Sequence, residues 1–148
     1  MALTTPMALI ANMNAADTFL DFVNALNAHD VVRLCDLMDT DHVFVDSLGK
    51  EHRGRAVMSE GWTAYFAMIP DYKISIAQFL IDSSTILAVG DACGTYARDG
   101  QLSPEDRWCV PTAWRAVVKG RHVALWQVYA DNEPIRALMR KANQPKST

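Results

Sequence analysis

The order of two kinds of pattern constrains the fold most: helical patterns come first, and a run of β-type stretches follows. From Tyr72 onward, four stretches rich in Val, Ile, Thr and aromatic residues are separated by short turn sequences. They span residues 72–81, 85–96, 107–118 and 121–129. Because these strands follow one another without helices between them, we predict an antiparallel sheet and an α+β fold.

Three helical patterns precede the strands, and a fourth follows them. In the first helix, apolar residues recur at helical spacing from Phe19 to Leu26. The four predicted helices cover residues 15–28, a short segment capped by Asp30, residues 54–68 and residues 132–141.

One domain is predicted over residues 14–142, because 148 residues can bury a single core. Residues 1–13 are predicted to be a loose leader, since Pro6 argues against a continuous helix there. Residues 143–148 are predicted to be a polar tail. A long sheet with helices on one face can curl into a cone, and clefts of that kind are where small-molecule sites form.

Composition argues against several classes of function. A net charge of −3 leaves no basic surface for nucleic acid or anionic lipid. No apolar run approaches the length of a membrane span and no basic signal region is present, so a cytoplasmic protein is predicted.

Cys35, Cys93 and Cys109 are far apart and odd in number, which favours buried free thiols. The histidines lack ligand spacing and the chain lacks nucleotide and zinc motifs, so no metal or cofactor is predicted.

A short strand that ends in a carboxylate is the first candidate for chemistry. In the segment from His42 to Gly49, period-two alternation places His42, Phe44 and Asp46 on one face. Asp46 at the strand end is a candidate general base if that face lines a pocket. It can equally cap the turn that follows, since Asp before a turn readily accepts hydrogen bonds from nearby backbone N–H groups. His42 is a candidate for electrostatic coupling to Asp46.

The end of the last strand holds the second candidate. Asp131 follows Tyr129 and Ala130 and can reach a cavity mouth as an acid or base. It can also cap the final helix, which begins near Pro134, and its position favours the cap.

Several short motifs follow one another in a characteristic order. They are Asn27-Ala28-His29-Asp30, the segment from Asp41 to Gly49, Arg53-Gly54, Tyr65-Phe66 with Pro70-Asp71, the Gly120 hairpin, and the ending from Trp126 to Asp131. Over roughly residues 15–140, this order resembles the nuclear-transport-factor-2-like superfamily, and within it the SnoaL-like and ketosteroid isomerase-like branches. The resemblance implies a cone-shaped fold, with N-terminal helices packed in the concave face of a strongly curved antiparallel sheet, often paired into dimers.

The resemblance also implies roles for particular residues. In ketosteroid isomerases a general base stands at the position of Asp46, with a Tyr and a protonated Asp as oxyanion donors. Phe22 and Ala113 stand where those donors would be, and neither side chain can donate a hydrogen bond. Losing one such donor typically costs about a hundred- to a thousandfold in rate, which argues against that reaction here. SnoaL-like cyclases use an Asp close to Asp131, although Asp131 lies one residue later than expected. Limonene epoxide hydrolases need an Asp-Arg-Asp set that bridges water and epoxide. The residues expected to face inward in this chain do not supply such a set.

The same matching sorts side chains between the two faces of the sheet. The residues expected to line a ligand pocket inside the cone are Phe22, Phe44, Met58, Trp62, Tyr65, Phe66, Ala113, Leu125, Gln127 and Tyr129. Trp108, Trp114 and Trp126 are expected to point outward. Exposed aromatic patches commonly mark interfaces, so a homodimer built on these three tryptophans is predicted.

We therefore expect a small enzyme that acts on an apolar, cyclic or polyketide-like carbonyl compound. Asp46 would take a proton alpha to the carbonyl, while Tyr129, Trp62 or a water stabilises the developing charge. The aromatic wall would raise the pKa of Asp46 by desolvation. Two alternatives remain on the same cone: a ligand-binding module without catalysis, and a dimerising domain whose cone is filled by its core.

Overall fold

The computed structural model describes residues 5–145. These residues form four α-helices, a 3-10 helix and six strands. In chain order they are α1 (Pro6–Ala28), α2 (Val31–Leu37), β1 (Met38–Val45), β2 (Glu51–Arg53), α3 (Arg55–Met68), β3 (Lys73–Asp82), β4 (Thr85–Thr95), η1 (Pro104–Asp106), β5 (Arg107–Lys119), β6 (His122–Ala130) and α4 (Glu133–Ala142).

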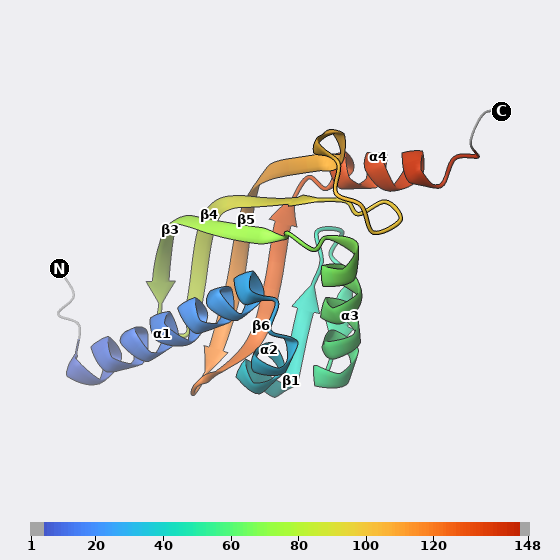
Figure 1. Ribbon diagram of the computed structural model, residues 1–148. Helices are drawn as coiled ribbons and strands as arrows, with labels where there is room; N and C mark the ends of the chain where they lie inside the picture. The colour runs from blue at the N-terminus through green and yellow to red at the C-terminus, as the bar shows by residue number, and fades with distance from the viewer. Residues whose placement is uncertain (1–4, 146–148) are drawn as a thin grey trace.

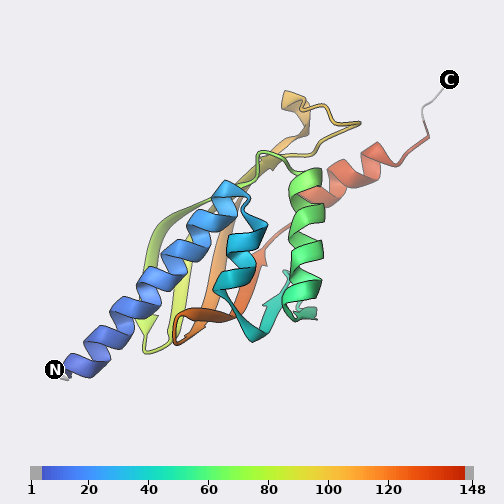
Figure 2. The same cartoon turned by 60° about the horizontal axis from the view of Figure 1, so that its bottom comes forward.

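The six strands form one curved sheet with the order β2-β1-β6-β5-β4-β3. Helix α1 crosses one face of the sheet and contacts β3 to β6, while α3 stands against β1 and β2 (Figure 1). A second view shows α1, α2 and α3 on the same side of the sheet (Figure 2). This arrangement confirms the predicted α+β cone. The sheet is mixed rather than purely antiparallel, because β1 pairs in parallel with β6.

The core lies between α1 and the inner face of the sheet. Phe19 and Phe22 on α1 are fully buried, as their helical spacing predicts. The ring centroid of Trp126 on β6 lies 4.7 Å from that of Phe22 and 5.8 Å from that of Phe19. Trp114 on β5 lies beside Trp126, with 6.5 Å between the ring centroids. Large aromatic side chains remove the most apolar surface from water, so this cluster fixes α1 on the sheet.

The predicted assignment of the two sheet faces is wrong. The exposed fractions of Trp108, Trp114 and Trp126 are 5%, 1% and 1%, so these side chains point inward. Tyr129, predicted inside the cone, is 51% exposed on the outer face, and Ala113 lies opposite it on β5. Alternation along a strand shows which residues share a face but does not show which face is buried. The tryptophans are therefore part of the core and cannot form the predicted dimer interface.

The predicted loose leader is also wrong where the structure describes it. Helix α1 begins at Pro6, and the hydroxyl of Thr5 accepts a hydrogen bond from the backbone N–H of Ala8 at 3.3 Å. Proline is well suited to the first position of a helix, because that position needs no backbone N–H donor. Pro6 therefore starts the helix instead of interrupting it. Residues 1–4 of the leader and residues 146–148 of the predicted tail lie outside the described residues.

Two of the three cysteines contradict the prediction of buried free thiols. Cys93 on β4 lies directly opposite Cys109 on β5, and the two form a disulfide. Cys109 is exposed on the outer face of the sheet, and Cys35 is free and half-buried. Strand register brings the pair together across a separation of 16 residues, which their spacing along the sequence does not reveal.

Between residues 5 and 145, no helix is both long and apolar enough to cross a membrane.

His42 on β1 is fully buried beneath α1. Its Nδ1 atom lies 2.6 Å from the carbonyl oxygen of Val123, and its Nε2 atom has no hydrogen-bond partner among residues 5–145. Desolvation by burial lowers the pKa of His42, an effect that the hydrogen bond to Val123 only partly offsets. Asp39 and Arg55 act on the ring in opposite directions. His42 is therefore a core residue of β1 and forms no contact with Asp46.

We expect acid to destabilise the fold through His42. Its folded pKa lies below the ordinary value of 6.5, so below that pH the unfolded chain binds a proton that the folded chain does not. The free energy of unfolding should fall between pH 7 and pH 5, by up to about 1.4 kcal/mol per pH unit. Urea titrations of wild type and His42→Asn should show a flatter pH dependence in the variant. The exposed His122→Gln should keep the wild-type slope, and an unchanged slope in His42→Asn would refute the assignment.

Candidate functional site

A cavity of about 270 Å³ lies between α3 and the inner face of the sheet. Its wall is mainly aromatic and apolar, with a few polar groups near the ends of β1 and β6. The lining residues are Phe44, Asp46, Ser47, His52, Val57, Met58, Gly61, Trp62, Tyr65, Tyr72, Ala92, Trp108, Thr112, Val128, Ala130 and Asn132. Pockets of this kind, apolar with a few convergent polar groups, are typical of small-molecule sites.

Asp46 closes a turn and lines the cavity at the same time. Its Oδ1 atom accepts hydrogen bonds from the backbone N–H groups of Leu48 and Lys50, each at 3.0 Å. Gly49 adopts a φ of 82° in this turn, a conformation that glycine tolerates best. The Oδ2 atom remains, and it lies 3.1 Å from Nε2 of His52. The sequence offered two interpretations of Asp46, a turn cap and a pocket carboxylate. The structure shows that its side chain caps the turn and also lines the cavity.

The environment of Asp46 contradicts the expected rise of its pKa. Partial burial does act to raise the pKa, and it is the largest single effect. Hydrogen bonds from His52 and from the backbone N–H groups of Lys50 and Leu48 together outweigh it and lower the pKa of Asp46 below 3.8. Hydrogen bonds to a carboxylate stabilise its charged form. Asp46 therefore remains an anion at neutral pH.

Sequence reasoning missed His52, which is the partner of Asp46. The antiparallel pairing of β1 with β2 sets Phe44 opposite His52 and returns the chain alongside Asp46. Both Asp46 and His52 have side chains that are 30% exposed. The signal in the sequence that could indicate this pair is the spacing of Asp46 and His52 across a tight turn. The Asp46–His52 pair therefore lies in the cavity wall.

Four aromatic side chains form a continuous wall from α3 to β5. The ring centroids of Trp62 and Tyr65 lie 6.0 Å apart, those of Tyr65 and Tyr72 lie 5.0 Å apart, and those of Tyr72 and Trp108 lie 6.2 Å apart. Phe44 on β1 meets Trp62 edge-on at 5.7 Å. Perpendicular and tilted contacts of this kind fix the rings in place.

His29 supports this wall from behind. Its ring stacks on Phe66 with 4.2 Å between the centroids, and its Nε2 atom lies 2.7 Å from the carbonyl oxygen of Tyr72. The neighbouring Asn27 makes two 2.9 Å hydrogen bonds to the backbone of Ile74, donating to its oxygen and accepting from its nitrogen. These contacts tie the end of α1 to β3, whose free edge would otherwise expose unpaired backbone groups.

The hydrogen-bonding groups of this wall are mostly donors. The indole Nε1 atoms of Trp62 and Trp108 are buried and have no hydrogen-bond partner among residues 5–145. Desolvation by burial raises the pKa of Tyr65 and of Tyr72, and in Tyr72 the neighbouring Tyr65 adds to the effect. Both phenols therefore stay protonated and serve as donors rather than bases.

The structure brings together five of the twelve site residues predicted from sequence. Asp46, Phe44, Met58, Trp62 and Tyr65 line the cavity. The remaining predicted residues do not line it: Phe22 and Phe66 lie in the core behind it, Ala113, Leu125, Gln127 and Tyr129 lie on the outer-face positions of the sheet, and Asp131 lies at the start of α4. The inverted sheet faces explain the four outer-face residues, because their neighbours Thr112, Val128 and Ala130 take the inner positions.

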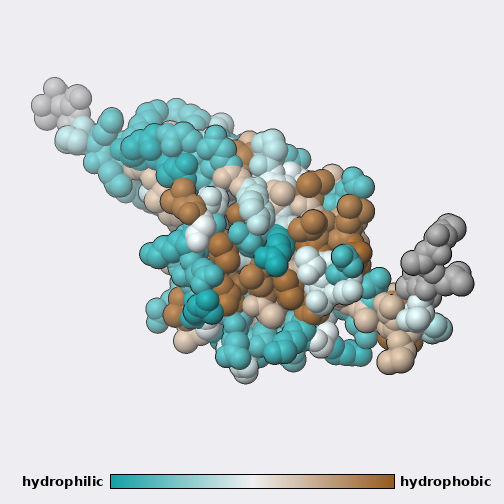
Figure 3. Space-filling model, turned by 180° about the vertical axis from the view of Figure 1, so that it is seen from behind, coloured by the Kyte–Doolittle hydropathy of each residue, from teal (hydrophilic) through white to brown (hydrophobic). Residues whose placement is uncertain are grey.

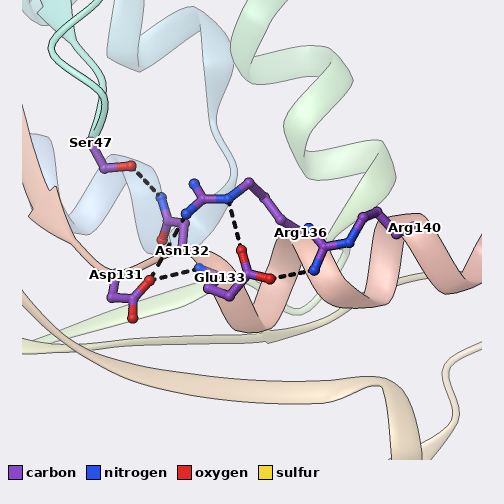
Figure 4. Close-up of polar contacts among 6 residues, drawn as sticks. All are labelled: Ser47, Asp131, Asn132, Glu133, Arg136 and Arg140. Carbon is purple, nitrogen blue, oxygen red and sulfur yellow. Dashed lines mark hydrogen bonds and ion pairs between the residues drawn. The ribbon is translucent and has the colours of Figure 1, made fainter.

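Asp131 lies at the start of α4 in the structure, as its position just before the predicted final helix indicated. Its side chain is 82% exposed, and Oδ1 accepts a hydrogen bond from the backbone N–H of Glu133 at 2.9 Å (Figure 4). The next residue, Asn132, lines the cavity instead and donates through Nδ2 to the hydroxyl of Ser47 at 2.9 Å. This bond joins the end of β6 to the turn that holds Asp46.

The residues from 5 to 145 contain no cluster of three or more His, Cys, Asp or Glu side chains arranged to hold a metal ion.

The family comparison identifies the domain to which this geometry belongs. The model of the SnoaL-like domain matches residues 19–137. No curated protein is significantly similar to the chain in sequence.

Solved structures share the fold at low sequence identity. A putative SnoaL-like polyketide cyclase from Jannaschia sp. CCS1 has a TM-score of 0.75 at 11% identity, covering 98% of this chain and 99% of that one. A putative SnoaL-like polyketide cyclase from Shewanella denitrificans OS-217 has a TM-score of 0.73 at 12% identity, covering 86% and 97%. A hypothetical protein with a ketosteroid isomerase-like fold from Catenulispora acidiphila DSM 44928, in complex with trimethylamine, has a TM-score of 0.72 at 18% identity, covering 86% and 96%. These similarities establish the fold.

We expect the two oxygen atoms of Asp46 to have separable effects on stability. Asp46→Ala removes the acceptor for two backbone N–H groups and should lower the free energy of unfolding by about 1–2 kcal/mol. Asp46→Asn keeps an acceptor at Oδ1 and should retain most of the stability of the wild type. Urea unfolding at pH 7 measures both. Equal losses in the two variants would show that the turn does not depend on this side chain.

Proposed function

The chain belongs to the SnoaL-like domain family, and we propose that its cavity is the active site of an enzyme that transfers a proton on an apolar, cyclic carbonyl compound. One observation carries the proposal: an ionised Asp46 in hydrogen-bond contact with His52 in the wall of an aromatic cavity. A titratable pair in a largely apolar cleft is the usual form of a general acid–base site. The putative polyketide cyclases among the structural neighbours are consistent with a substrate of this class.

In the proposed mechanism the two members of the pair have different roles. Asp46 stays charged and accepts the Nε2–H of His52, which leaves Nδ1 of His52 as the proton acceptor. The base takes a proton from the carbon next to the carbonyl, and the electron pair of that C–H bond moves to the carbonyl oxygen as an enolate. Return of the proton to the same or a conjugated carbon completes the step. The carboxylate stabilises the imidazolium that forms in between.

The donors of ketosteroid isomerases are not available for the enolate. Phe22 lies in the core under Trp126, and Ala113 lies on the outer face of the sheet. Tyr129, one of the groups expected from sequence to stabilise the charge, is also on the outer face. Trp62, the other side chain expected in that role, does line the cavity. Of the groups expected from sequence to stabilise the enolate, Trp62 and a water molecule remain.

We expect the protein to catalyse exchange of the α-hydrogens of α-tetralone in deuterium oxide. This bicyclic ketone is apolar, has acidic C–H bonds beside its carbonyl, and can be followed by NMR. His52→Gln and Asp46→Asn should each slow the exchange by about a hundredfold or more, the usual contribution of a positioned base. Asp131→Asn, outside the cavity, is the matched control and should leave the rate unchanged. Exchange that is insensitive to both His52→Gln and Asp46→Asn would refute the mechanism.

We also propose that the outer face of the sheet joins two copies of the chain. Apolar side chains are exposed there on three strands: Leu80 on β3, Leu87 and Val89 on β4, and Tyr129 on β6. Figure 3 shows apolar surface on this side, away from the helices. The same face carries Asp91 and Arg115, so a copy related by a two-fold axis can set opposite charges against each other. A second copy of the chain therefore matches this face in both polarity and charge.

Light scattering after size exclusion should give the mass of a dimer at micromolar concentration. Leu87→Lys combined with Val89→Lys should produce monomers, because two desolvated charges would oppose association. Val32→Lys adds a charge at an exposed apolar residue on α2 and should remain dimeric. A monomeric wild type would exclude the interface.

A further inference from the structure

Two polar side chains meet in the cavity wall beside the Asp46–His52 pair. We propose that the amide of Asn132 and the hydroxyl of Ser47 together bind a hydroxyl group of the ligand. The ligand of this cavity is then an apolar ring that carries a hydroxyl group. This inference rests on the proposed function, since the same cavity is taken as the ligand site, and it narrows the class of ligand.

The parallel pairing of β1 with β6 brings these two side chains together. Phe44 lies opposite Trp126, and the two strands run side by side toward the same edge of the sheet (Figure 1). Ser47 follows the end of β1, and Asn132 follows the end of β6. Nδ2 of Asn132 donates to the hydroxyl oxygen of Ser47 at 2.9 Å (Figure 4). Strand pairing therefore creates a polar subsite from two segments that are far apart in the sequence.

This hydrogen bond leaves a free acceptor on one side chain and a free donor on the other. Because Nδ2 of Asn132 is bonded to Ser47, the Oδ1 atom is the end of the amide that remains free to accept. The hydroxyl of Ser47 accepts that bond and keeps its own O–H to donate. A ligand hydroxyl can donate to Oδ1 of Asn132 while it accepts from Ser47. An ether oxygen has no proton and can use Ser47 alone.

The amide of Asn132 does not serve the helix that follows it. Asn132 stands at the N-cap position of α4, where an Asn side chain usually accepts a hydrogen bond from a backbone N–H of the first turn. Its side chain makes no such bond, and Asp131 instead accepts from the backbone N–H of Glu133. The oxygen atom of Asn132 is therefore left for a partner outside the helix.

The free oxygen atom of Asn132 is accessible to a ligand. Among residues 5–145, the buried side-chain nitrogen and oxygen atoms that lack a hydrogen-bond partner belong to His42, Trp62 and Trp108 alone. The unpaired Oδ1 atom of Asn132 is not one of them, so it keeps accessible surface in a residue that lines the cavity. The same is true of Nδ1 of His52, the proposed base. A hydroxyl bound at this subsite therefore holds the ligand next to that base.

Three probes test the inference: α-tetralol carries a hydroxyl group, its methyl ether keeps the oxygen atom but loses the proton, and tetralin lacks both. NMR titrations should show α-tetralol binding about three- to tenfold more tightly than the other two. Asn132→Ala and Ser47→Ala should each weaken α-tetralol binding about three- to tenfold and change tetralin binding by less than about twofold. Asp131→Ala is the matched control, since it alters the start of α4 outside the cavity and should keep the wild-type affinities.

A measurement on the wild type does not depend on the stability of the variants. The NMR signal of the side-chain carbonyl carbon of Asn132 should shift downfield when α-tetralol binds, because the oxygen atom then accepts a hydrogen bond. The methyl ether should leave that signal in place. Any of the following results would overturn the inference: no binding of α-tetralol at millimolar concentration, equal affinity for its methyl ether, unchanged α-tetralol affinity in either Asn132→Ala or Ser47→Ala, or equal weakening of α-tetralol and tetralin in these variants.

These outcomes are distinct from those of the exchange experiment, because α-tetralol has no carbonyl group and forms no enolate. Hydroxyl-selective binding that depends on Asn132 and Ser47, without exchange of α-tetralone, would refute the proposed reaction and leave the subsite standing. Exchange that depends on His52, combined with equal affinity for α-tetralol and its ether, would refute the subsite alone.

Discussion

The inner face of the sheet is the constraint on which both the core and the site depend. On β5, Trp114 lies over the filled part of the cone, where it packs beside Trp126 and close to the aromatic residues of α1. Farther along the same face, Trp108 and Thr112 line the cavity. Because alternate residues of a strand share one face, the position that fills the core also fixes which side chains reach the cavity. The burial of two tryptophans therefore sets the composition of the site.

The turn after β1 links local backbone geometry to the chemistry of the site. Asp46 uses one oxygen atom to satisfy two backbone N–H groups and the other to hold His52. The same hydrogen bonds that stabilise the turn keep the carboxylate ionised, so Asp46 is a weak base by itself. A charged carboxylate is, however, well suited to orient an imidazole and to stabilise its protonated form. The proposed mechanism therefore uses the Asp46–His52 pair and not Asp46 alone.

The sequence predicts the local features and not the non-local ones. The helices and strands, the cap at Asp30 and the helix-end position of Asp131 follow from neighbouring residues. The parallel pairing of β1 with β6, the disulfide between Cys93 and Cys109 and the contact of His52 with Asp46 depend on strand register. The two sheet faces were assigned from the family resemblance, and this assignment is wrong. Both faces of β5 and β6 offer apolar residues, so the alternation pattern could not correct it.

The end of β6 shows why a one-residue offset matters for function. The resemblance to SnoaL-like cyclases implied a carboxylate at this position, but Asp131 points into solvent and Asn132 lines the cavity. An amide neither takes up nor releases a proton near neutral pH, so Asn132 can position groups but cannot act as an acid or base. Its hydrogen bond to Ser47, the residue next to Asp46, makes it a support for the turn. The acid–base role that we propose for this cavity therefore falls to Asp46 and His52, and Asn132 supports the turn that holds Asp46.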